Sequence, residues 1–106
     1  MKSKLAIIFL SLFVLTGCTA ISLTSEGEKI RVMGKDDVVA CKHIGKTTAT
    51  VTAKVAGLKR KEHIIKKELE ILARNAAANM GGDTIIAVGK IDEGKQSFKV
   101  YKCRGR

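Results

Sequence analysis

The N-terminal seventeen residues restrict most strongly what this chain can fold into, because they have the layout of a segment that is removed after export. A basic start, Met1–Lys4, precedes a predominantly apolar run, Leu5–Leu15. This run has the length of the apolar core of a secretory signal and is short for a bilayer span. We therefore expect residues 1–17 to be a cleaved signal peptide, which leaves one small domain from a chain of 106 residues.

The end of this segment, Leu15-Thr16-Gly17-Cys18, resembles the lipobox that bacterial lipoprotein-processing enzymes recognise. The resemblance implies that Cys18 carries diacylglycerol, that the chain is cut before it, and that its new amino group is acylated, as with palmitate. Several acyl chains make membrane attachment effectively permanent. Because Thr19 stands where lipoproteins retained in the inner membrane tend to have Asp, we expect the periplasmic face of the outer membrane of a Gram-negative bacterium. The alternative is an uncleaved membrane anchor or a secreted protein with an unmodified cysteine.

The charge of the expected mature chain is strongly positive. Removing Lys2 and Lys4 from the 20 basic residues leaves 18 against 10 acidic ones, a net charge of +8 with histidine neutral. Export makes nucleic acid an improbable partner, so the polyanions within reach are lipopolysaccharide, anionic phospholipid, peptidoglycan carboxylates and acidic envelope proteins.

Two further cysteines, Cys41 and Cys103, remain in the expected mature chain. In an oxidising compartment, thiols such as these pair. A bridge between them would stabilise the fold by about 4 kcal/mol on the chain-entropy model. The alternatives are a zinc or copper site that adds His43 and His63, or a thiol-dependent enzyme. The spacing lacks a close pair of ligands, so we expect a structural disulfide and no metal or other cofactor.

The first half of the mature chain reads as a tether followed by strands. Residues 18–28 are small and polar, typical of a short tether. Residues 29–33 alternate charged and apolar side chains and predict the first strand, closed by a turn at 34–37. Residues 38–45 and 47–55 predict further strands, with a bend or bulge at Gly45.

The second half predicts one helix and a hairpin. A helix is expected over 58–80, with an apolar stripe at spacings of four, three, four and four, formed by Ile65, Leu69, Leu72, Ala76 and Met80. Its water-facing side is expected to carry Arg60, Lys61, Lys67 and Arg74. Strands are expected at 83–89 and 96–103, joined by a turn at 92–95. The predicted fold is α+β over 29–106, a small mostly antiparallel sheet covered by one amphipathic helix, with one disulfide.

A basic segment at the start of the expected helix is the candidate anion-binding site, formed by Lys59, Arg60, Lys61, Lys66 and Lys67. If the helix start lies near the C-terminus, this site would extend to Lys99, Lys102, Arg104 and Arg106. The simpler interpretation is a solvated helix face. No pair of carboxylates stands out as catalytic, so we expect no enzymatic activity.

Several stretches carry a family resemblance, namely 15–18, 26–32, 41–45, 74–85 and 101–103. In them the chain resembles small Gram-negative outer-membrane lipoproteins of unknown function, distantly similar to the Rcs envelope-stress sensor lipoprotein RcsF. The resemblance implies a compact α+β domain in which Cys41 and Cys103 join an early strand to the last one. The chain departs from the stress sensor in having one possible bridge instead of two and in lacking a long proline-rich tether.

These observations favour a non-enzymatic, lipid-anchored periplasmic module that presents a basic surface to an envelope component. That component would be an envelope protein, lipopolysaccharide or peptidoglycan. The first alternative is a signalling lipoprotein that reports envelope or disulfide status. The second is a thiol- or metal-dependent enzyme.

Overall fold

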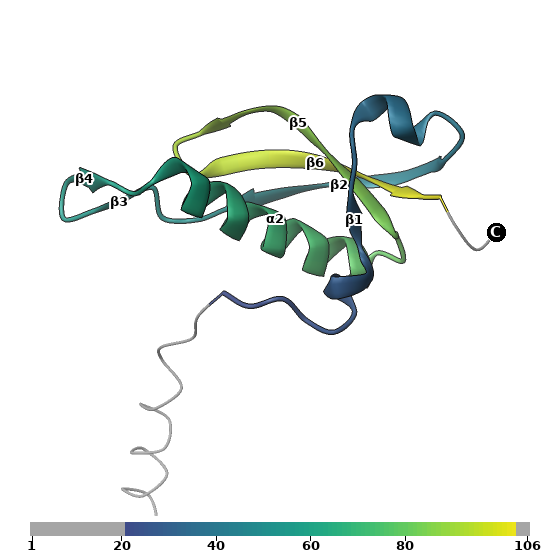
Figure 1. Cartoon of the computed structure of the whole chain (residues 1–106), viewed down its shortest axis with the longest axis horizontal. Helices are drawn as coiled ribbons and strands as arrows, with labels where there is room; N and C mark the ends of the chain where they lie inside the picture. Colours follow the sequence, from purple (N-terminus) through teal and green to yellow (C-terminus); the bar gives the residue numbers. More distant parts are fainter. Residues whose placement is uncertain (1–20, 104–106) are drawn as a thin grey trace, which may run out of the picture.

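The computed structural model describes residues 21–103, which form one sheet, one long helix and a short separate hairpin (Figure 1). The four-stranded sheet has the order β1-β5-β6-β2, and β3 and β4 pair only with each other. The expected signal peptide, the predicted lipidation site Cys18 and the residues after Cys103 lie outside the described residues. The elements are, in chain order, η1 (Gly27–Lys29), β1 (Arg31–Val32), η2 (Lys35–Val38), β2 (Lys42–Thr50), β3 (Lys54–Val55), β4 (Leu58–Lys59), α2 (Glu62–Asn79), β5 (Thr84–Asp92) and β6 (Lys95–Lys102).

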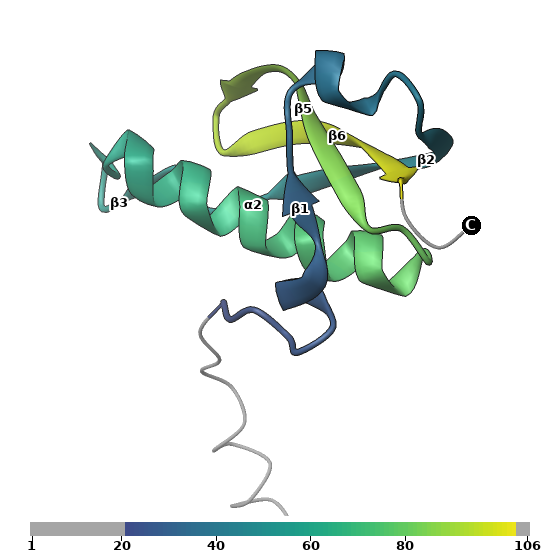
Figure 2. The same ribbon diagram turned by 45° about the vertical axis from the view of Figure 1, so that its right-hand side comes forward.

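Helix α2 covers one face of the sheet and supplies four of the ten buried residues of the core cluster (Figures 1 and 2). Its buried stripe repeats every four residues, at Ile65, Leu69, Ala73 and Ala77. Facing it are the buried side chains of Ile85 on β5 and of Phe98 and Val100 on β6. The small alanines allow the second half of the helix to approach the sheet closely. The predicted α+β architecture, with a mostly antiparallel sheet under one helix, is confirmed.

The predicted stripe is correct only in the first half of the helix. Ile65 and Leu69 are buried as expected, whereas Leu72 and Ala76 are half-buried and Met80 lies beyond the helix end. The helix ends there because Gly81 adopts a positive φ of 87°, which reverses the chain into β5.

The first predicted strand is shorter than expected and lies parallel to its neighbour. Only Arg31 and Val32 pair, opposite Thr84 and Ile85 of β5. Before them the chain turns through η1, and backbone bonds from Arg31 N to Asp83 O and from Met33 N to Ile85 O fix the pairing. The alternating pattern over 29–33 therefore indicated a strand but not its length or direction.

The second predicted strand begins later than expected. Residues 35–38 form η2, and β2 begins only at Lys42, because Asp37 N–H donates to Gly34 O (3.0 Å) and Cys41 N–H donates to Val38 O (3.0 Å). β2 then runs antiparallel to β6, with a register shift between His43 and Gly45. The predicted bulge at Gly45 is thus confirmed.

The predicted helix start at Leu58 is wrong. Residues 54–59 form the β3–β4 hairpin, in which Ala56 (φ 53°) and Gly57 (φ 80°) occupy both central positions of the turn. Two consecutive positive φ values match a two-residue hairpin turn of the primed type, and they are incompatible with a helix. Helix α2 starts at Glu62.

Candidate functional site

Two polar side chains in the second half of α2 hold the N-terminal segment of the described chain against the helix. Arg74 donates from Nε to the Ile30 carbonyl oxygen (3.1 Å) and from Nη2 to that of Glu28 (3.1 Å). The sequence predicted that Arg74 faces water. In the structure, its planar guanidinium instead donates hydrogen bonds to two backbone carbonyl groups of the N-terminal segment.

Asn75 binds the same segment nearer to its beginning. Its Oδ1 accepts hydrogen bonds from Thr24 N (3.0 Å) and Thr24 Oγ1 (3.1 Å), and its Nδ2 donates to the Ser22 carbonyl oxygen (3.0 Å). Gly27 is buried beneath this contact, and a Cβ atom on it would collide with Asn75 Oδ1. We call the contacts of Arg74 and Asn75 with residues 22–30 the tether clamp.

The tether clamp places residues 22–28, which the sequence assigned to the tether, in contact with the domain. Ser22 lies four positions after Cys18, so an extended connection between them spans at most about 14 Å. In both views the segment before η1 passes on the side of α2 that faces away from the sheet (Figures 1 and 2). A chain anchored at Cys18 would therefore hold this side of the helix close to the anchor.

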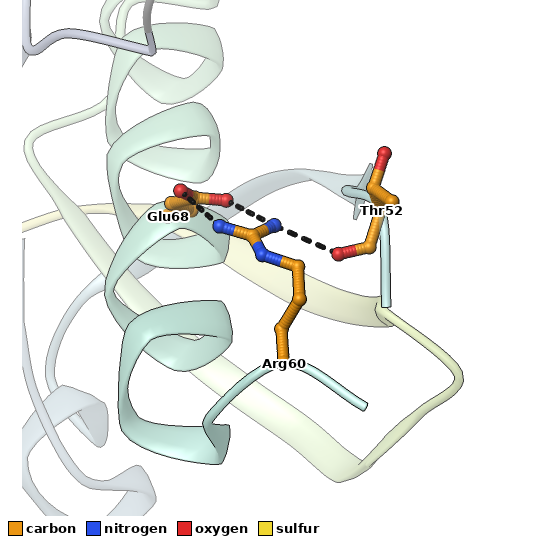
Figure 3. A network of polar contacts seen from close by, with 3 residues as sticks. All are labelled: Thr52, Arg60 and Glu68. Carbon is orange, nitrogen blue, oxygen red and sulfur yellow. Dashed lines mark hydrogen bonds and ion pairs between the residues drawn. The ribbon is translucent and has the colours of Figure 1, made fainter. Parts of the chain in front are cut away.

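A second network fixes the β3–β4 hairpin to the start of the helix (Figure 3). Arg60 pairs with Glu68 through two hydrogen bonds, Nη1 to Oε1 (3.0 Å) and Nη2 to Oε2 (2.7 Å), and Nη1 also donates to the Thr52 carbonyl oxygen (2.8 Å). The backbone N–H of Arg60 donates to Ala53 O (2.9 Å). Both charged side chains are about one quarter exposed, 24% and 23%.

This network also changes the acidity of its two charged groups. The hydrogen bonds donated by Arg60 lower the pKa of the Glu68 carboxyl below its ordinary value. The same bonds raise the pKa of Arg60. Because each group has its partner within the domain, the pair is explained by its structural role at the base of the hairpin.

The predicted anion-binding residues divide into one that is engaged and four that are exposed. Arg60 is held by Glu68 and Thr52, as described above. Lys59, Lys61, Lys66 and Lys67 are exposed, and none of them takes part in an ion pair within residues 21–103. We call these four lysines, on the hairpin and the first turns of α2, the basic surface.

Among the described residues, the predicted extension of the anion-binding site toward the C-terminus does not form. Lys102 lies at the end of β6 beside Gly81 and Gly82, where α2 ends. The C-terminal end of β6 and the start of α2 are at opposite ends of the domain (Figure 1). Lys99 is exposed on β6. Arg104 and Arg106 lie outside the described residues.

The cysteine and histidine residues do not gather into one site. Cys41 and Cys103 form a disulfide, with their Cα atoms 4.4 Å apart, as predicted. His43 meets Tyr101 edge-on, with ring centroids 5.2 Å apart, and His63 is exposed at the start of α2. Within residues 21–103, no group of three or more potential ligands is placed to hold a metal ion.

Two hollows of the described surface have linings of mixed charge. One, of about 470 Å³, lies between Glu26, Lys29, Asp83 and Lys102 near the end of α2. The other, of about 410 Å³, lies between Lys59, Arg60, Asp92 and Glu93 beside the hairpin. Opposite charges within each hollow disfavour a pocket dedicated to anions, so the basic surface is better suited to a broad anionic partner than to a small one.

The fold defines a small, disulfide-bonded α+β domain whose N-terminal segment is bound to its own helix. Within residues 21–103, no helix is long and apolar enough to cross a membrane. The chain belongs to a family described as a domain of unknown function (DUF4156), whose model matches residues 21–103. Neither the curated proteins nor the solved structures contain a match to this chain.

The sequence alone did not reveal the tether clamp. Arg74 and Asn75 interrupt an alanine-rich helical stretch, and Gly27 and Thr24 lie in the expected tether. A mid-helix Asn is unfavourable unless its side chain has a partner, so it was a signal that this side of the helix is covered. Nothing in the spacing indicated which segment covers it.

Proposed function

We propose that this protein is a lipid-anchored, non-enzymatic interaction module of the Gram-negative envelope, which uses its basic surface to bind an anionic envelope component. The observation that carries the proposal is the exposure of Lys59, Lys61, Lys66 and Lys67 on adjoining elements, without ion pairs inside the described domain. Clustered lysines on one surface raise the local potential and attract polyanions.

The anchor is supported by the sequence before the domain and by the tether clamp. Leu15-Thr16-Gly17-Cys18 has the order of residues expected for lipid attachment at Cys18, and Thr19 favours the outer membrane. The clamp begins at Ser22, so a lipidated chain would be held close to the bilayer rather than on a long flexible spacer. The resemblance to small outer-membrane lipoproteins supports the same location.

The resemblance to the RcsF stress sensor does not carry its mechanism to this chain. Residues 21–103 contain one disulfide, Cys41–Cys103, and a tether clamped to the helix. A short clamped tether favours action at the membrane that holds the anchor, whereas a long tether would allow contact at a distance. We therefore propose binding at the anchoring membrane as the role of the domain.

The anchor is tested by the intact mass of the native protein extracted from membranes, before and after reduction and thiol alkylation. We expect a mass with lipid at Cys18, and alkylation of Cys41 and Cys103 only after reduction. An unlipidated mass contradicts the anchor.

The binding role is tested by crosslinking in cells, with a quadruple lysine-to-glutamine variant of the basic surface. The matched control changes four exposed lysines elsewhere in the domain, Lys35, Lys46, Lys90 and Lys99. Both variants lose the same charge. We expect the native chain and the control to give the same crosslinked species and the basic-surface variant to lose it. Equal crosslinking by the two variants contradicts the proposal.

A further inference from the structure

The β3–β4 hairpin exposes an apolar tip between lysines. Lys54 pairs with Lys59 across its base, and Val55 pairs with Leu58 next to the turn. Val55 is 59% and Leu58 is 74% exposed. The hairpin extends beyond the start of α2, away from the four-stranded sheet (Figure 1). Two branched aliphatic side chains are therefore presented to solvent side by side.

The hairpin contains two features that cost stability and that the fold does not require. Like charges directly opposite each other, as at Lys54 and Lys59, destabilise a strand pair. Ala56 has a φ of 53°, where Asn, Asp or Gly is the usual residue of such a turn. Ala56 keeps the tip free of polar side chains, and the two lysines border it with positive charge. Both costs are explained if the tip has an external partner.

The base of the hairpin is held firmly although its tip is exposed. An isolated two-stranded hairpin is marginally stable in water. Here the guanidinium of Arg60 joins it to Thr52 and Glu68 (Figure 3). The backbone N–H of Arg60 also donates to Ala53 O. The tip is thus presented in a defined direction, which lowers the entropy lost on binding.

The composition of the hairpin fits a lipid surface better than a protein surface. Residues 53–61 contain four basic and no acidic side chains and no aromatic ring. Protein interfaces are depleted in lysine and rely on aromatic and arginine anchors, whereas the only arginine here is engaged by Glu68. Aliphatic side chains bordered by lysines match the boundary between acyl chains and anionic headgroups.

A stripe along the outer side of α2 leads from the hairpin end of the helix to the tether clamp. Ile64, Lys67, Ile71 and Asn75 follow one another at spacings of three, four and four, which places them on one side of the helix. Ile64 and Lys67 are exposed, and Asn75 binds the N-terminal segment. The side of the helix that receives the tether therefore continues toward the hairpin with apolar and basic side chains.

We infer that the tip of the β3–β4 hairpin, Val55–Leu58, inserts into an anionic phospholipid leaflet, with Lys54 and Lys59 at its headgroups. The leaflet is the one that holds the Cys18 anchor, and this second contact fixes the orientation of the domain on it. The inference rests on the proposed function, whose anionic envelope component it identifies as phospholipid.

The test uses the mature chain with Cys18→Ser, which has no lipid and retains residues 21–103, to which every described contact belongs. The chain has no tryptophan, so Leu58→Trp introduces one fluorescent reporter at the tip. Val39→Trp is the matched control, because Val39 is 83% exposed in the η2–β2 connection, away from the hairpin. Vesicles of phosphatidylglycerol with phosphatidylethanolamine are compared with vesicles of phosphatidylcholine.

We expect a blue shift of Leu58→Trp emission, and quenching by brominated acyl chains, on the anionic vesicles alone. The Val39→Trp reporter should stay unshifted. In the chain without tryptophan, Val55→Ser and Leu58→Ser should each weaken vesicle binding about tenfold, and Lys54→Gln about fivefold. Circular dichroism should show the fold unchanged, because all three side chains are exposed.

Three results overturn the inference: no shift of the Leu58→Trp reporter, equal shifts of both reporters, or binding that the serine variants do not weaken. These results do not depend on the anchor, because the protein tested carries no lipid. A native protein that is lipidated and crosslinked through its basic surface, but whose hairpin does not enter vesicles, keeps the proposed function and removes only this inference. If the hairpin enters vesicles but the native protein carries no lipid at Cys18, the contact of the hairpin with phospholipid stands and the anchor of the proposed function is removed.

Discussion

Replacing Asn75 with alanine should release the beginning of the domain while leaving its core folded. The substitution removes three hydrogen bonds, two accepted from Thr24 and one donated to Ser22. These bonds are exposed, so each contributes about 0.5–1 kcal/mol, and their sum is roughly 2 kcal/mol. The helix itself gains about 0.6 kcal/mol, because Ala has a higher helix propensity than Asn.

The two effects act on different parts of the molecule, which makes them separable. Opening of residues 22–28 should become easier by about 2 kcal/mol, or roughly thirtyfold, whereas the free energy of global unfolding should change by less. Hydrogen exchange resolves the two, because the Thr24 amide donates to Asn75 and the Glu28 amide donates to Thr24 O (2.9 Å). We expect these two amides to lose protection while those of β5 and β6 keep it.

Asn79→Ala is the matched control for this prediction. Asn79 is exposed in the last turn of the same helix, and within residues 21–103 its side chain makes no hydrogen bond. This variant should leave the Thr24 and Glu28 amides as protected as in the native chain. Unchanged protection in Asn75→Ala, or an equal loss in both variants, would refute the role assigned to Asn75.

Three further predictions concern stability. Replacing Cys41 and Cys103 together with serine should lower the free energy of unfolding by about 4 kcal/mol, because their bridge closes a loop with a separation of 62 residues; urea denaturation with and without reductant checks this, and a loss below about 1 kcal/mol would contradict it. Leu69→Ala should cost about 2–5 kcal/mol, since Leu69 is fully buried between α2 and the sheet, and an equal urea midpoint for variant and native chain would disprove that packing role. Because the pKa of Glu68 is lowered in the folded state, its pairing with Arg60 stabilises the protein above the unfolded pKa of about 4.3, and this contribution is lost as the pH falls through the lower folded pKa. Glu68→Gln should therefore have a lower free energy of unfolding than the native chain at pH 7, and the two values should converge in acid. A difference that persists in acid would exclude the ion pair as its cause.

The sequence predicted the elements better than it predicted where they begin. The buried positions Ile65 and Leu69 of α2 and the strand over 96–103 were readable because each reflects burial of one face. The second strand of the hairpin, Leu58–Lys59, was misread as helix because Lys59 and Lys61 resemble the polar side of a helix. Ala56, an excellent helix former, hides a positive φ that only Gly57 hinted at.

The sequence predicted that the candidate site is rich in basic residues, but not which of these residues are exposed and unpaired in the folded domain. The density of lysine between Lys59 and Lys67 is a property of the sequence. Removal of Arg60 from that set depends on Glu68, which lies eight residues later in α2 and which Arg60 meets because it precedes the helix instead of belonging to it. This pairing depends on the residue at which the helix begins, and local spacing did not give that residue.

The sequence by itself determined the helix, the two long strands of the C-terminal hairpin, the irregularity at Gly45 and the pairing of Cys41 with Cys103, since these follow from local periodicity or from the presence of two cysteines within residues 21–103. Only the tertiary structure decided that β1 lies parallel to β5 and that Arg74 and Asn75 bind residues 22–30. The physical reason is that local patterns record whether a side chain is buried or exposed, whereas a hydrogen bond across 44 to 53 residues depends on which segments the packed core brings together.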